Sequence, residues 1–319
     1  MDKEILINVD QIDRYYGDQC AVDGISFSVT RGEVLGFLGP NGAGKSTTMQ
    51  IICGVLAASS GTITIAGYDI VDDASQAKQH IGFLPERPPL YDDLTVDEYL
   101  TYCARIRLVS RNKLANALAN SKQRCGLQNH GKRLIGNLSK GYQQRVGIAQ
   151  SIIHNPSVVI LDEPTSGLDP VQIVEIRELI SELGADHSVI LSTHILPEVQ
   201  SSCDRVLIIN RGRLVLDEKI QSLHNDSHQA CCTVALRNAP LLEELDKIEG
   251  ITHVDSLDQF RFRIIYRRDI NLPQQLADIA AASNWGLFEL IPEQDSLEQT
   301  FVRLTRGELD QPPNIDKNL

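Results

Sequence analysis

A glycine-rich segment near residue 40 constrains the fold of this chain more than any other feature. It fits the pattern G-x-x-x-x-G-K-[ST], and its eight residues are Gly39, Pro40, Asn41, Gly42, Ala43, Gly44, Lys45 and Ser46. The apolar run at 33–38 predicts a buried strand before the loop, and residues 45–52 predict a helix after it. A strand, this loop and a helix in that order form the context in which the pattern binds the phosphates of a nucleotide.

The chemistry of this loop follows from its place at a helix N-terminus. Free backbone N–H groups and the positive end of the helix dipole favour a phosphate there, and glycines let the backbone approach it closely. We expect Lys45 to reach the β- and γ-phosphates and the Ser46 hydroxyl to contact Mg²⁺. The alternative is a loop with accidental glycines. Because kinases, GTPases and transport ATPases share the motif, other residues must choose the activity.

The bulk properties limit the domains and partners of the chain. A chain of 319 residues is longer than one hydrophobic core usually supports, so we expect two domains. The net charge of −12 argues against a general nucleic-acid binder. The seven cysteines show no C-x-x-C spacing, which indicates reduced thiols in the cytosol. No apolar run approaches the roughly 18 residues of a transmembrane helix, so a membrane role requires a partner protein.

Strand and helix patterns alternate through residues 1–222, which predicts an α/β domain with a mostly parallel sheet. Apolar runs predict strands at 5–9, 25–29, 34–38, 62–66, 158–161, 189–192 and 206–209. Between about 88 and 153 helical patterns dominate, and Thr95 with Glu98 predicts a capping box at the start of one helix. We therefore expect a helical subdomain inserted at about 88–153.

A second pattern begins after residue 222 and predicts an accessory α+β domain at 223–306. The predicted elements are strands at 231–236, 251–255, 260–266 and 287–291, with helices at 241–248 and 273–282. Their order is β-α-β-β-α-β, which is typical of a ferredoxin-like domain. A last helix is predicted at 296–304, and the polar segment at 307–319 is expected to be a disordered tail.

Two carboxylates follow the predicted strand at 158–161. Asp162 lies where a P-loop ATPase needs an acid for the Mg²⁺ shell. Its neighbour Glu163 is placed to orient or deprotonate the attacking water. The alternative is that both acids cap the turn before Pro164. Their occurrence together with the phosphate-binding loop favours the ATPase interpretation.

The segment Leu138-Ser-Lys-Gly-Tyr-Gln-Gln-Arg145 gives the chain its family resemblance. It resembles the signature of the ATP-binding cassette (ABC) transporters, Leu-Ser-Gly-Gly-Gln, and departs from it at Lys140 and Tyr142. Ser139 and Gly141 match the family pattern, and the resemblance implies that both contact the γ-phosphate. It also implies the fold of an ABC cassette, in which a mostly parallel sheet is joined by an antiparallel β part and a helical insert.

Other segments match further motifs of the same family. Asp169, in Ser166-Gly-Leu-Asp169, resembles the D-loop, and His194, in Leu191-Ser-Thr-His194, matches the switch histidine. Tyr16 lies where the family places an aromatic that stacks on adenine, with Tyr15 as an alternative core residue. Thr47 continues the phosphate-binding loop into its helix, and the resemblance adds it to the residues that bind nucleotide.

The Q-loop of the family is altered in this chain. In Ile81-Gly-Phe-Leu-Pro-Glu86 a glutamate stands where the family usually has glutamine. A carboxylate near a triphosphate is repelled unless a cation offsets its charge, so Glu86 is a candidate Mg²⁺ ligand. The alternative is that Glu86 points away, toward the membrane partner.

The resemblance implies both an activity and its partners. Two ATP-binding subunits pair head to tail, as copies of one chain or as two related chains, and each ATP with its Mg²⁺ lies between the phosphate loop of one and the signature of the other. A separate membrane permease holds them at the inner face of the cell membrane, while the chain itself is cytoplasmic. The motifs are most similar to those of bacterial ABC-2-type exporters, the group with multidrug, sodium and gliding-motility systems. A soluble ABC ATPase, a non-hydrolytic regulatory module and an importer remain as alternatives.

Overall fold

The chain divides into two compact units, Met1–Ile220 and Gln221–Leu319. The structure, a computed structural model, describes residues 4–223, 229–267, 269–293 and 301. Each unit has its own hydrophobic core. The helix predicted at 296–304, apart from Phe301, and the tail predicted at 307–319 lie outside the described residues.

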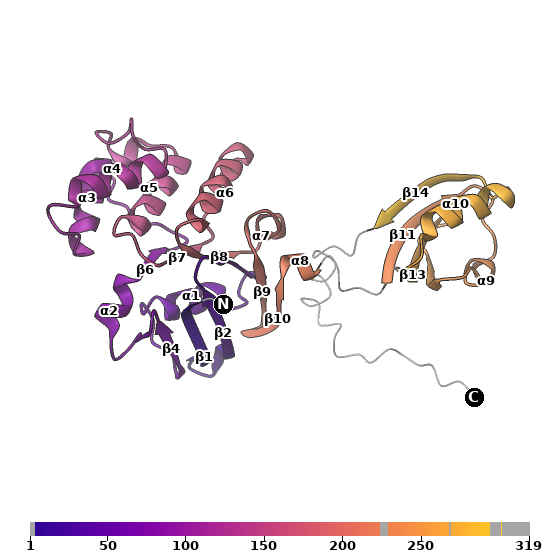
Figure 1. Cartoon of the computed structure of the whole chain (residues 1–319), viewed down its shortest axis with the longest axis horizontal. Coiled ribbons are helices and arrows are strands. Elements are labelled where there is room, and N and C mark those ends of the chain that lie inside the picture. Colours follow the sequence, from indigo (N-terminus) through magenta and orange to yellow (C-terminus); the bar gives the residue numbers. More distant parts are fainter. Residues whose placement is uncertain (1–3, 224–228, 268, 294–300, 302–319) are drawn as a thin grey trace. The chain divides into compact units, whose positions relative to one another are not determined.

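A six-stranded sheet in the order β10-β9-β3-β8-β7-β6 forms the centre of the first unit (Figure 1). Its strands are β3 (Val34–Leu38), β6 (Ile81–Leu84), β7 (Val158–Asp162), β8 (Ser188–Thr193), β9 (Arg205–Asn210) and β10 (Arg213–Lys219). All pairs are parallel except β10 with β9, which is antiparallel. The carboxyl ends of the five parallel strands therefore meet at one edge, where loops from distant parts of the chain come together.

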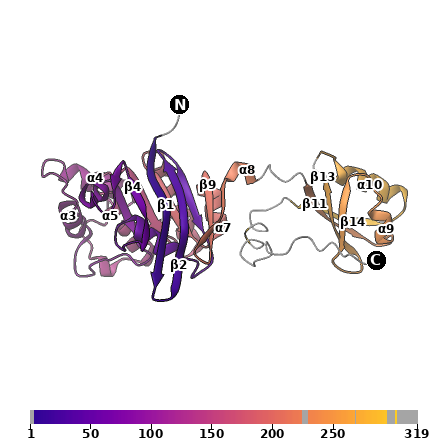
Figure 2. The same cartoon turned by 90° about the horizontal axis from the view of Figure 1, so that it is seen from below.

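An antiparallel sheet lies beside the parallel one, with β1 and β2 as its long strands (Figure 2). Its order is β2 (Gln19–Thr30), β1 (Ile5–Tyr16), β4 (Ser60–Ile65) and β5 (Tyr68–Asp69). The first hydrophobic core joins both sheets to helix α1 (Lys45–Ile52) through residues such as Val9, Met49 and Ile160. This antiparallel part, expected from the resemblance, helps to fix the helix that follows the phosphate-binding loop.

The opposite face of the parallel sheet packs against helices. These include α3 (Val96–Ile106), α4 (Leu114–Arg124), α5 (Lys140–Ile152) and α6 (Pro170–Gly184). In β7, Val158 and Ile160 belong to the first core whereas Val159 and Leu161 belong to the second, because successive strand residues point to opposite faces. Buried faces on both sides explain why the parallel strands read as continuous apolar runs.

Short elements connect these layers. They are α2 (Ala74–Gln79), the 3₁₀ turn Ile135–Asn137, α7 (Leu196–Ser202) and α8 (Ile220–Leu223). The predicted capping box at α3 is confirmed, since the Thr95 hydroxyl accepts from the backbone N–H of Glu98 and the Glu98 carboxylate accepts from the backbone N–H of Thr95. Such a cap satisfies two N–H groups that the helix itself leaves without partners.

The second unit has the predicted element order. Its elements are β11 (Gln229–Leu236), α9 (Leu242–Leu245), β12 (Ile251–Ser256), β13 (Arg261–Arg267), α10 (Leu272–Ala282) and β14 (Leu287–Glu293). The strands form an antiparallel sheet in the order β12-β13-β11-β14. Helix α9 is shorter than the predicted helix at 241–248, and Gly250, with φ 94°, turns the chain into β12.

In the segments that the structure describes, none of the helices combines the length and the apolar character that crossing a bilayer requires.

Candidate functional site

The phosphate-binding loop links β3 to α1 at the carboxyl edge of the parallel sheet. Gly44 is the N-cap of α1 and has φ 106°, a left-handed conformation that favours glycine. A Cβ atom at Gly44 would lie 2.5 Å from the carbonyl oxygen of Ala21, so a larger residue would collide with the antiparallel sheet. No side chain caps the helix, which leaves its first N–H groups directed at the loop.

Lys45 is buried and directed back across the loop. Its Nζ donates to the carbonyl oxygens of Gly39, at 2.9 Å, and Pro40, at 3.3 Å. It also forms an ion pair with Oε1 of Glu163 at 3.3 Å, and the side chains are only 6% and 9% exposed. The Lys45 ammonium therefore lies between the loop backbone and the carboxylate that follows β7.

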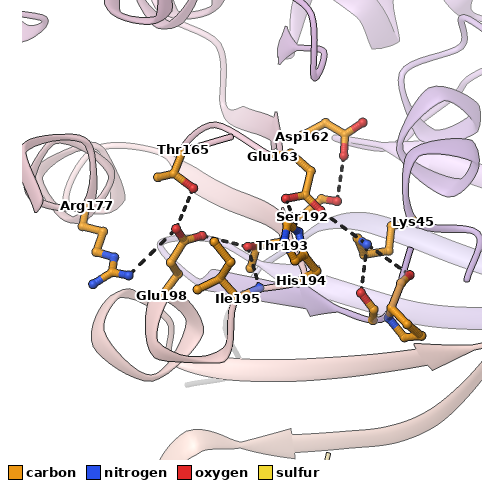
Figure 3. A network of polar contacts seen from close by, with 12 residues as sticks. Lys45, Asp162, Glu163, Thr165, Arg177, Ser192, Thr193, His194, Ile195 and Glu198 are labelled. Atoms are coloured by element: carbon orange, nitrogen blue, oxygen red, sulfur yellow. Dashed lines mark hydrogen bonds and ion pairs between the residues drawn. The ribbon is translucent and has the colours of Figure 1, made fainter. Parts of the chain in front are cut away.

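Glu163 and His194 come from the ends of neighbouring strands and contact each other. His194 Nδ1 lies 2.8 Å from Glu163 Oε2 (Figure 3). Glu163 has φ 48°, which is uncommon for a residue other than glycine and is typical of strained functional positions. The His194 side chain is 43% exposed, so the pair opens toward the surface at the histidine.

Asp162 is buried beside this pair. Its Oδ1 accepts a hydrogen bond from the Ser192 hydroxyl at 2.7 Å. Burial raises the pKa of the Asp162 carboxyl, and the charges of Glu163 and Glu86 raise it further, while hydrogen bonds from Ser192 and Ser46 act in the opposite direction. A cation at this position would favour the ionised carboxylate.

The donor set fits Mg²⁺. A hydroxyl and carboxylate oxygens are hard ligands, and Mg²⁺ usually takes only one or two carboxylates and completes its shell with phosphates and water. In the described segments, no group of three or more His, Cys, Asp and Glu residues is arranged to hold a metal by itself.

A cavity of about 740 Å³ opens over the loop, within the size range of small-molecule sites. The predicted site residues that line it are Tyr16, Asn41, Gly42, Gly44, Lys45, Ser46, Thr47, Glu86, Glu163 and His194. The guanidinium of Arg14 lies 4.7 Å from the centre of the Tyr16 ring. Tyr15 is 48% exposed, so the alternative that it is a core residue is wrong.

Sequence reasoning missed several residues of this cavity. They are Gln19, Cys20, Ala21, Ser166, Arg211 and Gly212. Ser166 belongs to the D-loop segment, which was a usable signal. Arg211 and Gly212 form the turn between β9 and β10, and the backbone N–H of Gly212 donates to Ala43 in the loop. Nothing in the local sequence links this turn to residue 43.

The signature residues do not line the cavity of the phosphate loop. The Ser139 hydroxyl caps α5, accepting from the backbone N–H of Tyr142 at 3.5 Å. Gly141 and Asp169 line a separate cavity of about 390 Å³ between α5 and α6. Asp169 caps α6 through the backbone N–H groups of Val171 and Gln172, both at 3.0 Å. One chain therefore holds the predicted site residues as two separate groups.

Together the parallel sheet, the loop after β3 and the carboxylates after β7 define a P-loop ATPase. The ABC transporter family model matches residues 22–166. The bacitracin transport ATP-binding protein BcrA of Bacillus licheniformis is 38% identical to this chain, covering 95% of this chain and 98% of BcrA. The linearmycin resistance ATP-binding protein LnrL of Bacillus subtilis is 31% identical, covering 94% and 98%.

Solved structures agree with these relatives. The structure of an ATP-binding subunit of an ABC transporter superposes with a TM-score of 0.63 and 31% identity, covering 69% of this chain and 92% of that one. The chain belongs to the ABC transporter family and is a nucleotide-binding subunit with ATPase activity.

Proposed function

We propose that this chain is the nucleotide-binding subunit of an ABC-2-type exporter and works as a head-to-tail dimer. The observation that carries this proposal is the separation of the two groups of site residues within one chain. Lys45 lines the larger cavity, whereas Gly141 and Asp169 line another. A second nucleotide-binding subunit, identical or related, would bring its signature Ser139 and Gly141 against the nucleotide held by the first.

The nucleotide is held by the phosphate loop and by Tyr16. Gly39 to Thr47 surround the phosphates with backbone N–H groups, and Lys45 attracts their oxygens. The Tyr16 ring, 47% exposed at the cavity, stacks on adenine. Asp169 contributes from the D-loop at the dimer interface.

Glu163 is the general base and His194 its partner in hydrolysis. A carboxylate within hydrogen-bond reach of water orients and deprotonates it for attack on the γ-phosphate. His194 donates to the charge that develops on the transferred phosphoryl group. The 2.8 Å contact between His194 Nδ1 and Glu163 Oε2 supports a concerted role for the two groups.

Ser46 and Asp162 would hold Mg²⁺, with Glu86 as a further oxygen ligand. Held by these residues, the cation would supply positive charge that offsets the negative charge that builds up during phosphoryl transfer. Glu86 lines the same cavity as Ser46, which supports this assignment, and its charge raises the pKa of Asp162. Contact of Glu86 with the permease is the competing role.

A separate membrane permease completes the transporter, and this chain binds it from the inner face of the cell membrane. The Glu86 loop and the helical subdomain transmit closure of the dimer, which ATP binding favours and hydrolysis reverses. BcrA is named for bacitracin transport and LnrL for linearmycin resistance. Both names support an exporter, because moving an antibiotic out of the cell gives resistance to it.

We further propose that the second unit is an accessory ferredoxin-like domain. The order β12-β13-β11-β14, combined with the β-α-β-β-α-β sequence of elements, supports this assignment. Along the sequence, this domain at 223–306 follows the cassette at 1–222 and precedes the segment at 307–319.

The variant Glu163→Gln tests the proposed mechanism. An amide cannot take a proton from water, so we expect hydrolysis to cease while ATP still binds and holds two chains together. Phosphate release and light scattering after size-exclusion chromatography with MgATP measure the two effects. Hydrolysis at the wild-type rate would exclude Glu163 as the base, and a variant that stays monomeric at high MgATP and protein concentrations would contradict the dimer.

A further inference from the structure

A buried carboxylate lies behind the Glu163–His194 pair. Glu198, on the short helix α7, is 1% exposed. Glutamate is almost never fully buried unless its charge is paired and hydrogen-bonded, because removing a carboxylate from water is costly. The groups that bond to the Glu198 carboxylate therefore indicate its role.

Each oxygen of the Glu198 carboxylate accepts a short hydrogen bond from a different segment, the turn after β7 or the last residue of β8. The Thr165 hydroxyl donates to Oε1 at 2.6 Å, and the Thr193 hydroxyl donates to Oε2 at 2.7 Å. Arg177 of α6 lies 3.9 Å from Oε1 and supplies a nearby positive charge. Figure 3 shows the carboxylate between the two threonines, with Arg177 and Lys45 on opposite sides of the network.

The two threonines flank the proposed catalytic pair along the chain. Thr165 comes two residues after Glu163, in the tight turn where the backbone N–H of Ser166 donates to the Glu163 carbonyl at 3.1 Å. Thr193 directly precedes His194, and its hydroxyl also accepts from the backbone N–H of Ile195 at 3.0 Å. The Thr193 side chain thus holds the backbone on both sides of the histidine.

We propose that Glu198 is a positioning residue for ATP hydrolysis. Its carboxylate ties the turn after β7 to the last residue of β8, and so keeps the side chains of Glu163 and His194 within hydrogen-bond distance of each other. This inference rests on the proposed roles of that pair. A brace of this kind is needed because Glu163 has a positive φ, a conformation that persists only where the surrounding structure enforces it.

The observed hydrogen bonds fit a carboxylate better than an amide. Both threonines donate, so both side-chain oxygens of residue 198 must accept. A glutamine offers one acceptor oxygen and one NH₂ donor, and one threonine hydroxyl would then lose its acceptor. The charge opposite Arg177 would also be lost.

The same sheet provides a matched control at the amino ends of its parallel strands, opposite the end that carries the phosphate loop. Glu33 precedes β3 and is 8% exposed. Its carboxylate also accepts from a threonine hydroxyl, that of Thr30 at 2.9 Å, and pairs with Arg205 at 3.0 Å. Because β3 begins there and the phosphate loop follows its far end, Glu33→Gln disturbs a similar cluster away from the nucleotide.

The test compares Glu198→Gln with Glu33→Gln in the full-length chain. We expect both variants to melt at a lower temperature. Only Glu198→Gln should lower kcat, by about 10- to 100-fold, because small displacements of catalytic groups have effects of this size. Its Kd for ATP should remain close to the wild-type value, since the phosphate loop is not part of the brace. A lower melting temperature with unchanged kcat would overturn the proposal.

Threonine variants keep the test decisive if Glu198→Gln does not fold. Thr193→Val and Thr165→Val keep the shape of the side chain and remove the donor, whereas the corresponding serine variants keep it. We expect low kcat for valine and near-normal kcat for serine. Equal kcat for valine and serine would refute the brace. If the Glu198 and threonine variants and Glu163→Gln all hydrolysed ATP at the wild-type rate, the proposed hydrolysis mechanism itself would fail. If Glu163→Gln were inactive while the Glu198 and threonine variants kept the wild-type rate, only the proposed role of Glu198 would fail.

Discussion

The phosphate-binding group and the signature group of this protein hold their polar side chains in different ways. Lys45 and Glu163 are buried, paired with each other and fixed by loops from several strands. Ser139 and Asp169 are exposed helix caps whose recorded contacts are with backbone N–H groups of their own helices. The first group is organised in the interior of the chain, whereas the second presents its side chains at the surface.

This difference predicts that the two groups control different properties, the affinity for ATP and the response to a partner chain. The loops that carry the buried group are in place before a ligand arrives, so binding needs little reorganisation of the backbone, and we expect this group to control the affinity for ATP. Exposed caps on a surface have little effect until a partner covers them. Variants in the two groups should therefore differ in whether their effect appears in one chain or only in a pair.

The largest expected effect separates Lys45→Ala from Ser139→Ala. Loss of a charged donor to phosphate should weaken ATP binding to the dilute monomer by about 10- to 100-fold. Ser139→Ala should leave that affinity unchanged and abolish ATP-induced dimer formation and hydrolysis. Isothermal titration calorimetry at low protein concentration and light scattering measure the two properties. If the Ser139→Ala monomer bound ATP as weakly as the Lys45→Ala monomer does, the proposed distinction between the two groups would be wrong.

A mixture of these two variants sharpens the comparison. A mixed dimer contains one intact composite site, formed by the phosphate loop of the Ser139→Ala chain and the signature of the Lys45→Ala chain. We expect the mixture to hydrolyse ATP faster than the sum of the separate variants, as measured by phosphate release. Activity that only adds up would argue against a site shared between chains.

Tyr16→Ala should have a smaller effect that is confined to the phosphate-binding group. Stacking of a base on an aromatic ring has an energy that corresponds to about a fivefold or greater loss of affinity. Tyr15→Ala is the matched control, since Tyr15 is equally exposed but does not line the cavity. Equal losses of ATP affinity in both variants, measured by calorimetry, would show that Tyr16 has no special role.

Glu86→Gln should have the smallest effect. If Glu86 is a further oxygen ligand of Mg²⁺, the Mg²⁺ concentration for half-maximal ATPase activity should rise, by up to about tenfold. The amide restores the usual family residue, so the loop should keep its shape. An unchanged Mg²⁺ requirement, together with weaker permease binding, would favour the competing role at the membrane partner.

The class of the protein and most of its strands could be predicted from the sequence alone. The predicted strand at 34–38 is confirmed in full as β3, and the apolar runs at 158–161 and 189–192 are confirmed within β7 and β8. These segments are buried on both faces, so their composition alone carries the signal. The strand β10 (Arg213–Lys219) was not predicted because its only apolar run, Leu214–Leu216, is short and is followed by charged, exposed residues.

The contacts that position the functional residues depend on the tertiary fold and could not be predicted from the sequence. Glu198, Thr165 and Thr193 lie on separate segments, and no spacing along the chain indicates that they meet. The same is true of Gly212 and Ala43. A local pattern reports which face of a strand or helix is buried, whereas the partner of a buried charge depends on which strand ends become neighbours in the folded sheet.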